Sequence, residues 1–164
     1  MDNRQRKIYV IESTHWDREW RFPFEPTRIR LLRMMDNLLD IAERNPDHKC
    51  YHLDGQAIML EDYLELRPQN ARRLKAACRA GKIIAGPWYT LPEENLVLGE
   101  SLVRNFLLGR LACREFGGAM PVGYSPTSYG QVSQMPQIMN GFGVDSILFY
   151  RGINNVVTRR AEFN

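Results

Sequence analysis

Two His-x-Asp pairs are the residues with the clearest chemical potential. His15 and Asp17 follow one apolar run, and His52 and Asp54 follow another. In an extended backbone, side chains two positions apart point the same way, so each pair can hold an ion from one side. A neutral imidazole nitrogen and a carboxylate suit zinc or a similar divalent metal. His15 and Asp17 are therefore candidate metal ligands.

The second pair leaves two interpretations open. His52 and Asp54 can join the first pair in a site with two histidines and two aspartates. Alternatively, His52 orients Asp54, which then accepts hydrogen bonds from substrate hydroxyls, because spacing alone does not separate coordination from hydrogen bonding. For the first pair, the alternative is a His-Asp hydrogen bond that orders a loop, since two ligands do not make a site.

Aromatic side chains accompany these polar groups. Trp16 and Trp20 flank the first pair, and Trp88 with Tyr89 follows a third apolar run. An indole beside polar groups offers a flat apolar face to the C–H surface of a sugar and an N–H for one of its oxygens. For Trp16 and Trp20, packing in the hydrophobic core is an equally good interpretation. All four are candidate substrate-binding residues, together with Asp54.

Further candidates lie in later segments. The adjacent residues Glu93 and Glu94 are more typical of the first turn of a helix than of a catalytic site, because their negative charges complement the helix dipole. Residues 124–131 are rich in hydroxyl groups and contain Pro and Gly. Arg151, after the last apolar run, suits an oxygen anion or a sugar hydroxyl, with an ordinary surface position as the alternative.

The segments between these residues predict alternating strands and helices. Short runs rich in β-branched residues indicate strands, and apolar residues at three-and-four spacing indicate helices. We expect strands at 7–12, 50–53, 82–85, 121–124 and 146–150, the first of them buried, and helices at 25–43, 59–66, 69–80, 98–116 and 134–142.

This alternation predicts an α/β fold of mostly parallel strands with outer helices. In such a sheet the loops at the carboxyl ends of the strands form the site. The loops concerned are 13–20, 52–56, 86–94, 124–131 and 150–154.

Composition narrows the class of partner. The chain has 164 residues, enough for one domain or a piece of one. The 22 Lys and Arg against 19 Asp and Glu leave a formal charge of only +3, so nucleic acid is not an expected partner. Arg28, Arg30 and Arg33 fall within a helical pattern and predict the solvated face of that helix.

Two further features bear on location. No run approaches the ~20 apolar residues of a membrane span, and the charged first residues lack a signal-peptide core, which predicts a cytoplasmic protein without a membrane partner. Cys50, Cys78 and Cys113 are odd in number and widely spaced, which indicates reduced, buried thiols.

Several segments taken together resemble glycoside hydrolase family 38, most closely its bacterial branch of α-mannosidases and mannosylglycerate hydrolase. The resemblance covers about residues 7–152 and rests on the order of the motifs THWDREW, LDGQ, GPWYT, YSPTSYGQ with SQMPQI, and FYRG. It implies that residues 1–164 form an incomplete N-terminal portion of a catalytic domain, the first part of a seven-stranded β/α barrel.

The resemblance also implies a chemistry. Family members bind zinc and cleave terminal α-mannosides with retention, through a covalent glycosyl-enzyme intermediate. By resemblance His15 and Asp17 bind zinc, a further histidine ligand lies downstream, and Trp20 and Arg151 line the substrate site. The expected partners are a mannoside and the remainder of the catalytic domain, with oligomerisation left open.

Two residues depart from the family pattern. Ser13 stands where the family usually has the first His of His-x-His, and Thr127 stands where the family has the Asp that acts as nucleophile and further zinc ligand. A threonine hydroxyl is neutral near pH 7 and needs a base to attack, whereas a carboxylate needs none.

Three functional hypotheses follow. The first is a zinc-dependent α-mannosidase-type hydrolase that recruits another acid, such as Asp54 or Glu94. The second is a catalytically impaired carbohydrate-binding remnant. The third, a metal-dependent phosphate or amide hydrolase, has less support because no Gly-rich turn precedes a helix.

Overall fold

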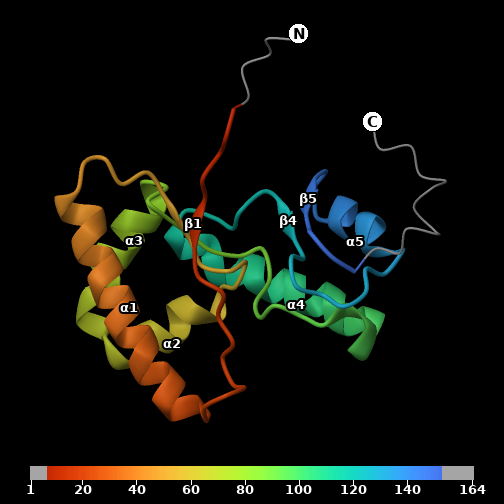
Figure 1. Cartoon of the computed structure of the whole chain (residues 1–164), viewed down its shortest axis with the longest axis horizontal. Helices are drawn as coiled ribbons and strands as arrows, with labels where there is room; N and C mark the ends of the chain where they lie inside the picture. Colours follow the sequence, from red (N-terminus) through yellow and green to blue (C-terminus); the bar gives the residue numbers. More distant parts are fainter. Residues whose placement is uncertain (1–6, 153–164) are drawn as a thin grey trace, which may run out of the picture.

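Strands and helices alternate along the chain in the computed structural model, which describes residues 7–152 (Figure 1). The strands are β1 (Glu12–Ser13), β2 (Tyr51–His52), β3 (Ile83–Ile84), β4 (Gly123–Tyr124) and β5 (Ile147–Leu148). The α-helices are α1 (Phe24–Arg44), α2 (Ile58–Leu66), α3 (Ala71–Arg79), α4 (Gly99–Ala112) and α5 (Met135–Gly141), and the 3-10 helices are η1 (Pro68–Asn70), η2 (Glu94–Leu96) and η3 (Cys113–Phe116).

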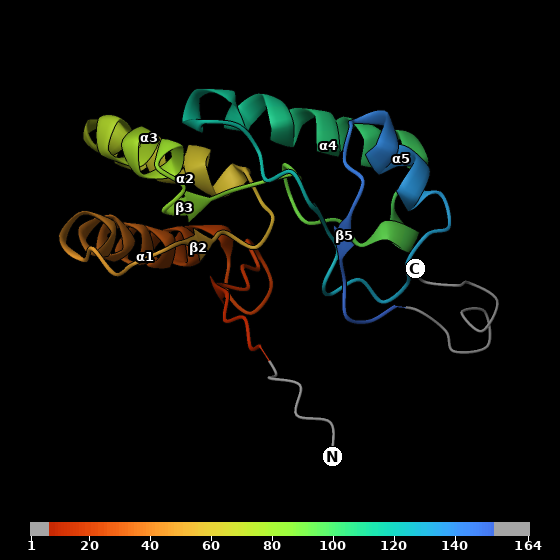
Figure 2. The ribbon, with the colours of Figure 1, turned by 90° about the horizontal axis from the view of Figure 1, so that it is seen from above.

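All strand pairs in this part of the chain are parallel. The order β1-β2-β3 forms one sheet, with Ser13 beside His52 and His52 beside Ile84, and β4 pairs with β5 in a second sheet. Helices α1, α2 and α3 lie beside the first sheet, α5 lies beside the second, and α4 runs from one group to the other (Figure 2). The predicted α/β class with parallel strands and outer helices is confirmed.

The strands of the described residues form two sheets, one of three strands and one of two. After β3 the chain reaches Pro87, which has no backbone N–H to donate to a neighbouring strand. The next residue, Trp88, donates its backbone N–H to Gly55 at 3.0 Å and forms an isolated bridge with Gln56. This bridge keeps the register of β2 with β3, so the segment after β3 runs on beside the segment after β2.

The first strand was predicted to be buried, and the structure contradicts this. Residues 8–11 are 62–88% exposed, and only Glu12 and Ser13 are paired. The reason is that β1 has β2 on one side and, among residues 7–152, no strand on the other. An apolar, β-branched run thus lies at an open edge of the sheet.

The main core packs α1 against α2 and α3, together with apolar residues of the first sheet. Leu31, Met35, Leu38, Leu39 and Ala42 occur at the spacing of one helix face and are all buried.

Arg28 belongs to this buried face, so the prediction that it is solvated is wrong. Its side chain is 7% exposed and pairs with Glu65, whereas Arg30 and Arg33 are exposed as expected. Tertiary pairing with α2 buries Arg28.

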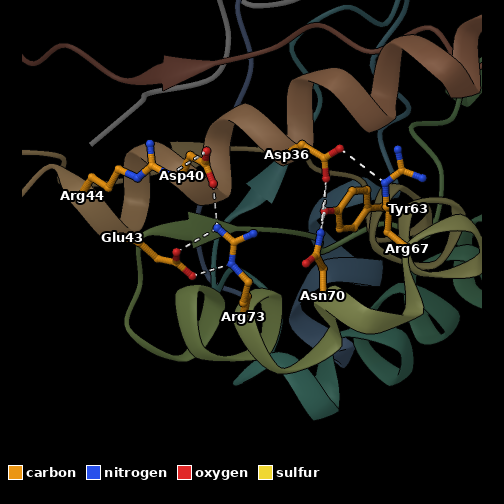
Figure 3. Close-up of polar contacts among 8 residues, drawn as sticks. All are labelled: Asp36, Asp40, Glu43, Arg44, Tyr63, Arg67, Asn70 and Arg73. Carbon is orange, nitrogen blue, oxygen red and sulfur yellow. Dashed lines mark hydrogen bonds and ion pairs between the residues drawn. The ribbon is translucent and has the colours of Figure 1, made fainter.

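Polar contacts join α1 to α2 and α3 (Figure 3). The Tyr63 hydroxyl donates to Asp36 at 2.6 Å and accepts from the Asn70 amide at 2.6 Å. Arg73 donates to Asp40 at 2.8 Å and to Glu43 at 2.6 and 2.8 Å. The apolar contact between these helices is therefore bordered by a set of charged hydrogen bonds that fixes their relative positions.

A second core lies between α4, α5 and the segment after β3. It contains Trp88, Leu102, Phe106, Met135 and Met139 among its buried residues. The buried face of α4 is narrow: Leu102 and Phe106 are buried, whereas Val103, Leu107 and Leu111 are 36–45% exposed.

The three cysteines are free thiols, but only Cys113 is buried; Cys50 and Cys78 are half-buried. Burial raises the pKa of the Cys78 and Cys113 thiols to about 12. Within residues 7–152, no helix has the length and apolar character needed to cross a bilayer.

Candidate functional site

The segments that follow the five strands line one cavity of about 1070 Å³. The lining residues that bear on the chemistry are His15, Trp16, Asp17, Trp20, Asp54, Gln56, Glu93, Thr127 and Arg151. Because the strands are parallel, their carboxyl ends face the same side, which brings together residues more than a hundred positions apart. Residues 153 and 154 of the fifth expected loop lie outside the described residues.

The first His-x-Asp pair lies at the mouth of this cavity. The His15 Nδ1 atom is 3.0 Å from Asp54 Oδ2, and the His15 Nε2 atom is 3.4 Å from Asp17 Oδ1. Asp54 as a carboxylate only accepts hydrogen bonds, so we assign the proton of the neutral imidazole to Nδ1. The Nε2 lone pair is then directed to the side on which the Asp17 carboxylate lies.

Asp54 is the anchor of this arrangement. It is 1% exposed and accepts hydrogen bonds from the Trp16 backbone N–H at 2.7 Å, the Gln56 amide at 3.3 Å and the Tyr124 hydroxyl at 3.3 Å. Burial raises its pKa, while these donors and His15 oppose that shift. Asp54 therefore fixes the 15–17 segment.

The turn after β2 makes this position of Asp54 possible. Asp54 has a left-handed φ of 49° and Gly55 a φ of 70°, a backbone conformation that short polar residues and glycine tolerate best. Gln56 completes the link because its amide also donates to the Trp16 carbonyl at 2.8 Å.

His52 does not join His15 and Asp17. It is 5% exposed, contacts the Tyr124 ring edge-on and is not among the residues that line the cavity. Burial lowers its pKa to about 4. Of the alternatives drawn from the sequence, neither a His52 metal ligand nor a His52–Asp54 hydrogen bond is found in the described part of the chain.

His15 and Asp17 supply a partial donor set for zinc. One imidazole nitrogen and one carboxylate are ligands that zinc accepts, and both side chains are accessible, at 51% and 41% exposed. No group of three or more described His, Cys, Asp or Glu side chains is arranged to hold a metal ion. The donor chemistry fits zinc, and a closed coordination sphere needs ligands beyond this pair.

Thr127 and Arg151 meet in the cavity lining, after the ends of β4 and β5. Arg151 Nε donates to the Thr127 carbonyl at 2.7 Å, and the guanidinium lies 4.2 Å from the centroid of the Tyr129 ring. Stacking and the backbone hydrogen bond hold Arg151 in the cavity wall. The half-buried Thr127 side chain also faces the cavity.

The predicted aromatic residues divide into two groups. Trp16 is half-buried and Trp20 is 72% exposed, and both line the cavity. Trp88 is fully buried and donates its indole N–H to the Tyr124 carbonyl at 2.7 Å, while the Tyr89 hydroxyl donates to Glu61 at 2.7 Å. Neither residue is among those that line this cavity, and their assignment as substrate-binding residues stays a prediction.

Sequence reasoning missed the contribution of Asn105. Its side chain accepts from the backbone N–H groups of Tyr89 and Thr90 at 2.9 and 3.0 Å and donates to the Thr90 carbonyl at 2.7 Å. It thus fastens the third loop to α4. An asparagine on a helix carries no local signal of such a distant partner.

The fold and the cavity define an α/β protein with a polar and aromatic site at the carboxyl ends of parallel strands. The chain belongs to glycosyl hydrolases family 38, because residues 5–163 match the N-terminal domain of that family.

Relatives of known name or structure agree with this assignment. The chain is similar to an α-mannosidase from Enterococcus faecalis V583, with 40% identity and a TM-score of 0.85 over 88% of this chain. It is 37% identical, over 91% of its length, to a Halalkalibacterium halodurans protein whose name includes the words mannosylglycerate hydrolase, and 32% identical, over 88%, to human alpha-mannosidase 2C1. It spans only 16%, 17% and 14% of these proteins, respectively.

Proposed function

We propose that this chain forms the substrate- and metal-binding face of a zinc-dependent hydrolase of terminal α-mannosides. In this proposal residues 1–164 are the N-terminal portion of a catalytic domain, and their strands begin a seven-stranded β/α barrel completed by further sequence. The observation that carries the proposal is the geometry of His15, with Nδ1 held by buried Asp54 and Nε2 directed toward Asp17, in a chain of family 38.

Zinc, when bound, supplies a positive charge that fixes and polarises sugar oxygens. His15 and Asp17 would hold it, and Asp54 keeps the His15 ring in the required tautomer. Trp16 and Trp20 offer apolar faces to the C–H surface of the ring, and Arg151 has guanidinium N–H groups beyond the one that binds Thr127.

Thr127 supports a second candidate, a carbohydrate-binding protein with impaired catalysis. In the part of the chain that the structure describes, the Thr127 hydroxyl donates no hydrogen bond to a side-chain base, and only the Thr127 carbonyl is hydrogen-bonded, to Arg151. Without such a base the hydroxyl stays protonated near pH 7 and is a weak nucleophile. Both candidates share the same mannoside and the same metal.

Mannose release from an aryl α-mannoside separates the two candidates. We would join residues 1–152 to the remaining sequence of the E. faecalis α-mannosidase, and compare the hybrid domain with its Thr127→Asp variant, with and without a chelator. Chelator-sensitive turnover by the unsubstituted hybrid supports the hydrolase. Turnover by the Thr127→Asp variant alone supports the binding protein, and absence of both turnover and mannose binding contradicts the proposal.

A further inference from the structure

Two adjacent carboxylates hold the loop that carries Thr127. Glu94, on η2, is 2% exposed and accepts from the Ser125 hydroxyl through Oε1 and from the Val132 backbone N–H at 2.9 Å through Oε2. These two contacts lie at opposite ends of the loop, residues 125–132. The side chain of Glu94 therefore links the two ends of the loop.

Glu93 holds the middle of the same loop. It accepts from the Ser128 hydroxyl at 3.0 Å and from the Tyr129 backbone N–H at 3.1 Å to each oxygen. Within the loop, the Gln131 amide donates to the Ser125 carbonyl at 3.1 Å and to the Arg151 carbonyl at 3.3 Å. The backbone on both sides of Thr127 is thus tied down.

The contacts of Glu94 are those of a supporting group rather than an acid. Both of its oxygens are taken by donors, and its side chain is not among those that line the cavity, whereas Glu93 and Thr127 are. A proton-transfer group has to come within hydrogen-bond reach of the reacting oxygen. Glu94 therefore does not fit the role of replacement acid that the sequence left open for it.

We infer that Glu93 and Glu94 are positioning residues, which hold the loop 125–132 so that the side chain at position 127 faces the sugar site. The catalytic consequence of this inference rests on the proposed function, whereas the hydrogen bonds that hold the loop belong to this chain alone. Preorganised backbone matters here because small displacements of a reacting group cost large factors in rate.

An isosteric amide distinguishes positioning from acid–base chemistry. In Glu94→Gln the amide oxygen can accept from the Val132 N–H, and the amide nitrogen can donate to the Ser125 oxygen, so both contacts survive. In Glu94→Ala both are lost. A positioning role predicts that Gln replaces Glu well, whereas an acid–base role predicts that Gln fails as completely as Ala.

Amide hydrogen exchange on the full chain tests the structural part. We expect Glu94→Ala to speed exchange at Tyr129 and Val132 at least tenfold, with α1 unaffected, and Glu94→Gln to leave these rates within threefold. Glu100→Ala is the matched control, because Glu100 is exposed and, among residues 7–152, pairs only with Arg104 on the same helix. Equal rates in all variants overturn the inference.

Kinetics of the hybrid domain test the catalytic part, in whichever background, unsubstituted or Thr127→Asp, shows turnover. We expect Glu94→Ala to lower kcat about a hundredfold with KM changed less than threefold, and Glu94→Gln to keep kcat within about fivefold. Loss of activity and of one limb of the pH profile in Glu94→Gln overturns the inference. If neither background turns over, the proposed function fails, and the exchange rates alone decide whether the loop is held as inferred.

Discussion

At the scale of single residues, the site depends on buried groups that do not themselves meet a ligand. Asp54 is held in a left-handed backbone conformation while it receives hydrogen bonds from the segment that carries His15. Residues kept in such conformations occur where the surroundings require them. The orientation of His15 is therefore set by a residue 39 positions away.

Replacing Asp54 with Asn is expected to weaken zinc binding about 10- to 100-fold. The Asn amide presents a donor to His15 Nδ1, so the imidazole proton moves to Nε2 and blocks the lone pair that faces Asp17. Competition with a zinc-binding dye measures the affinity, and ¹⁵N spectra of the histidine ring report the tautomer. Asp47→Asn, at an exposed position, is the control, and an unchanged tautomer would show that Asp54 does not orient His15.

His52 gives the protein an acid-sensitive group outside the cavity. Burial lowers its pKa from 6.5 to about 4, so between these values the unfolded chain binds a proton that the folded chain does not. Protonation of His52 therefore leaves the free energy of unfolding unchanged above about pH 6.5. As the pH drops toward 4, it lowers that free energy by up to roughly 3 kcal/mol. Urea unfolding of the chain and of His52→Phe should differ in this pH dependence; equal slopes would refute the assignment.

At the scale of elements, α4 connects the two cores. Its Asn105 binds the loop after β3, and its Gly109 lets the helix approach that loop closely. A Cβ atom at Gly109 would lie 2.2 Å from the Trp88 carbonyl carbon and 2.3 Å from the Pro87 oxygen. The helix and the third loop of the site are thus positioned together.

Gly109→Ala is expected to lower the free energy of unfolding by about 1–3 kcal/mol, because the clashing atoms belong to the backbone and cannot rotate away. Gly99→Ala in the same helix is the matched control, since a Cβ there meets nothing within 4 Å. Denaturant melts of both variants provide the comparison. Equal stability of the two would mean that α4 shifts without cost.

At the scale of the whole molecule, the described chain has an unprotected sheet edge. Residues 8–11 are apolar and exposed beside β1, and Leu148 on β5 is 49% exposed. Apolar strand edges promote association with other chains unless they are covered. The proposed barrel, in which further strands cover these edges, accounts for this composition.

The 164-residue chain on its own is expected to self-associate and to bind a hydrophobic dye through this edge. Val10→Lys should reduce both, because a lysine in the apolar segment that leads into the edge strand β1 disfavours pairing with another chain. Leu96→Lys is the control, since Leu96 is 83% exposed, close to the 85% of Val10, but belongs to η2 and not to the segment that leads into β1. Sedimentation and dye fluorescence measure the effect, and an equal response to both substitutions would place the contact elsewhere.

The sequence by itself determined the α/β class, the parallel strands and the helices, most of whose bounds lie within one or two residues of those observed. These follow from local periodicity and from turn residues, which act over a few positions. The motifs at the strand ends also sufficed to indicate the family. Tertiary structure alone decided that Asp54 holds His15, that Glu93 and Glu94 hold the Thr127 loop, that Trp88 and Arg28 are buried and that the first strand is exposed. Each of these depends on a partner that folding brings close from a distant part of the chain, and the local sequence does not indicate that partner.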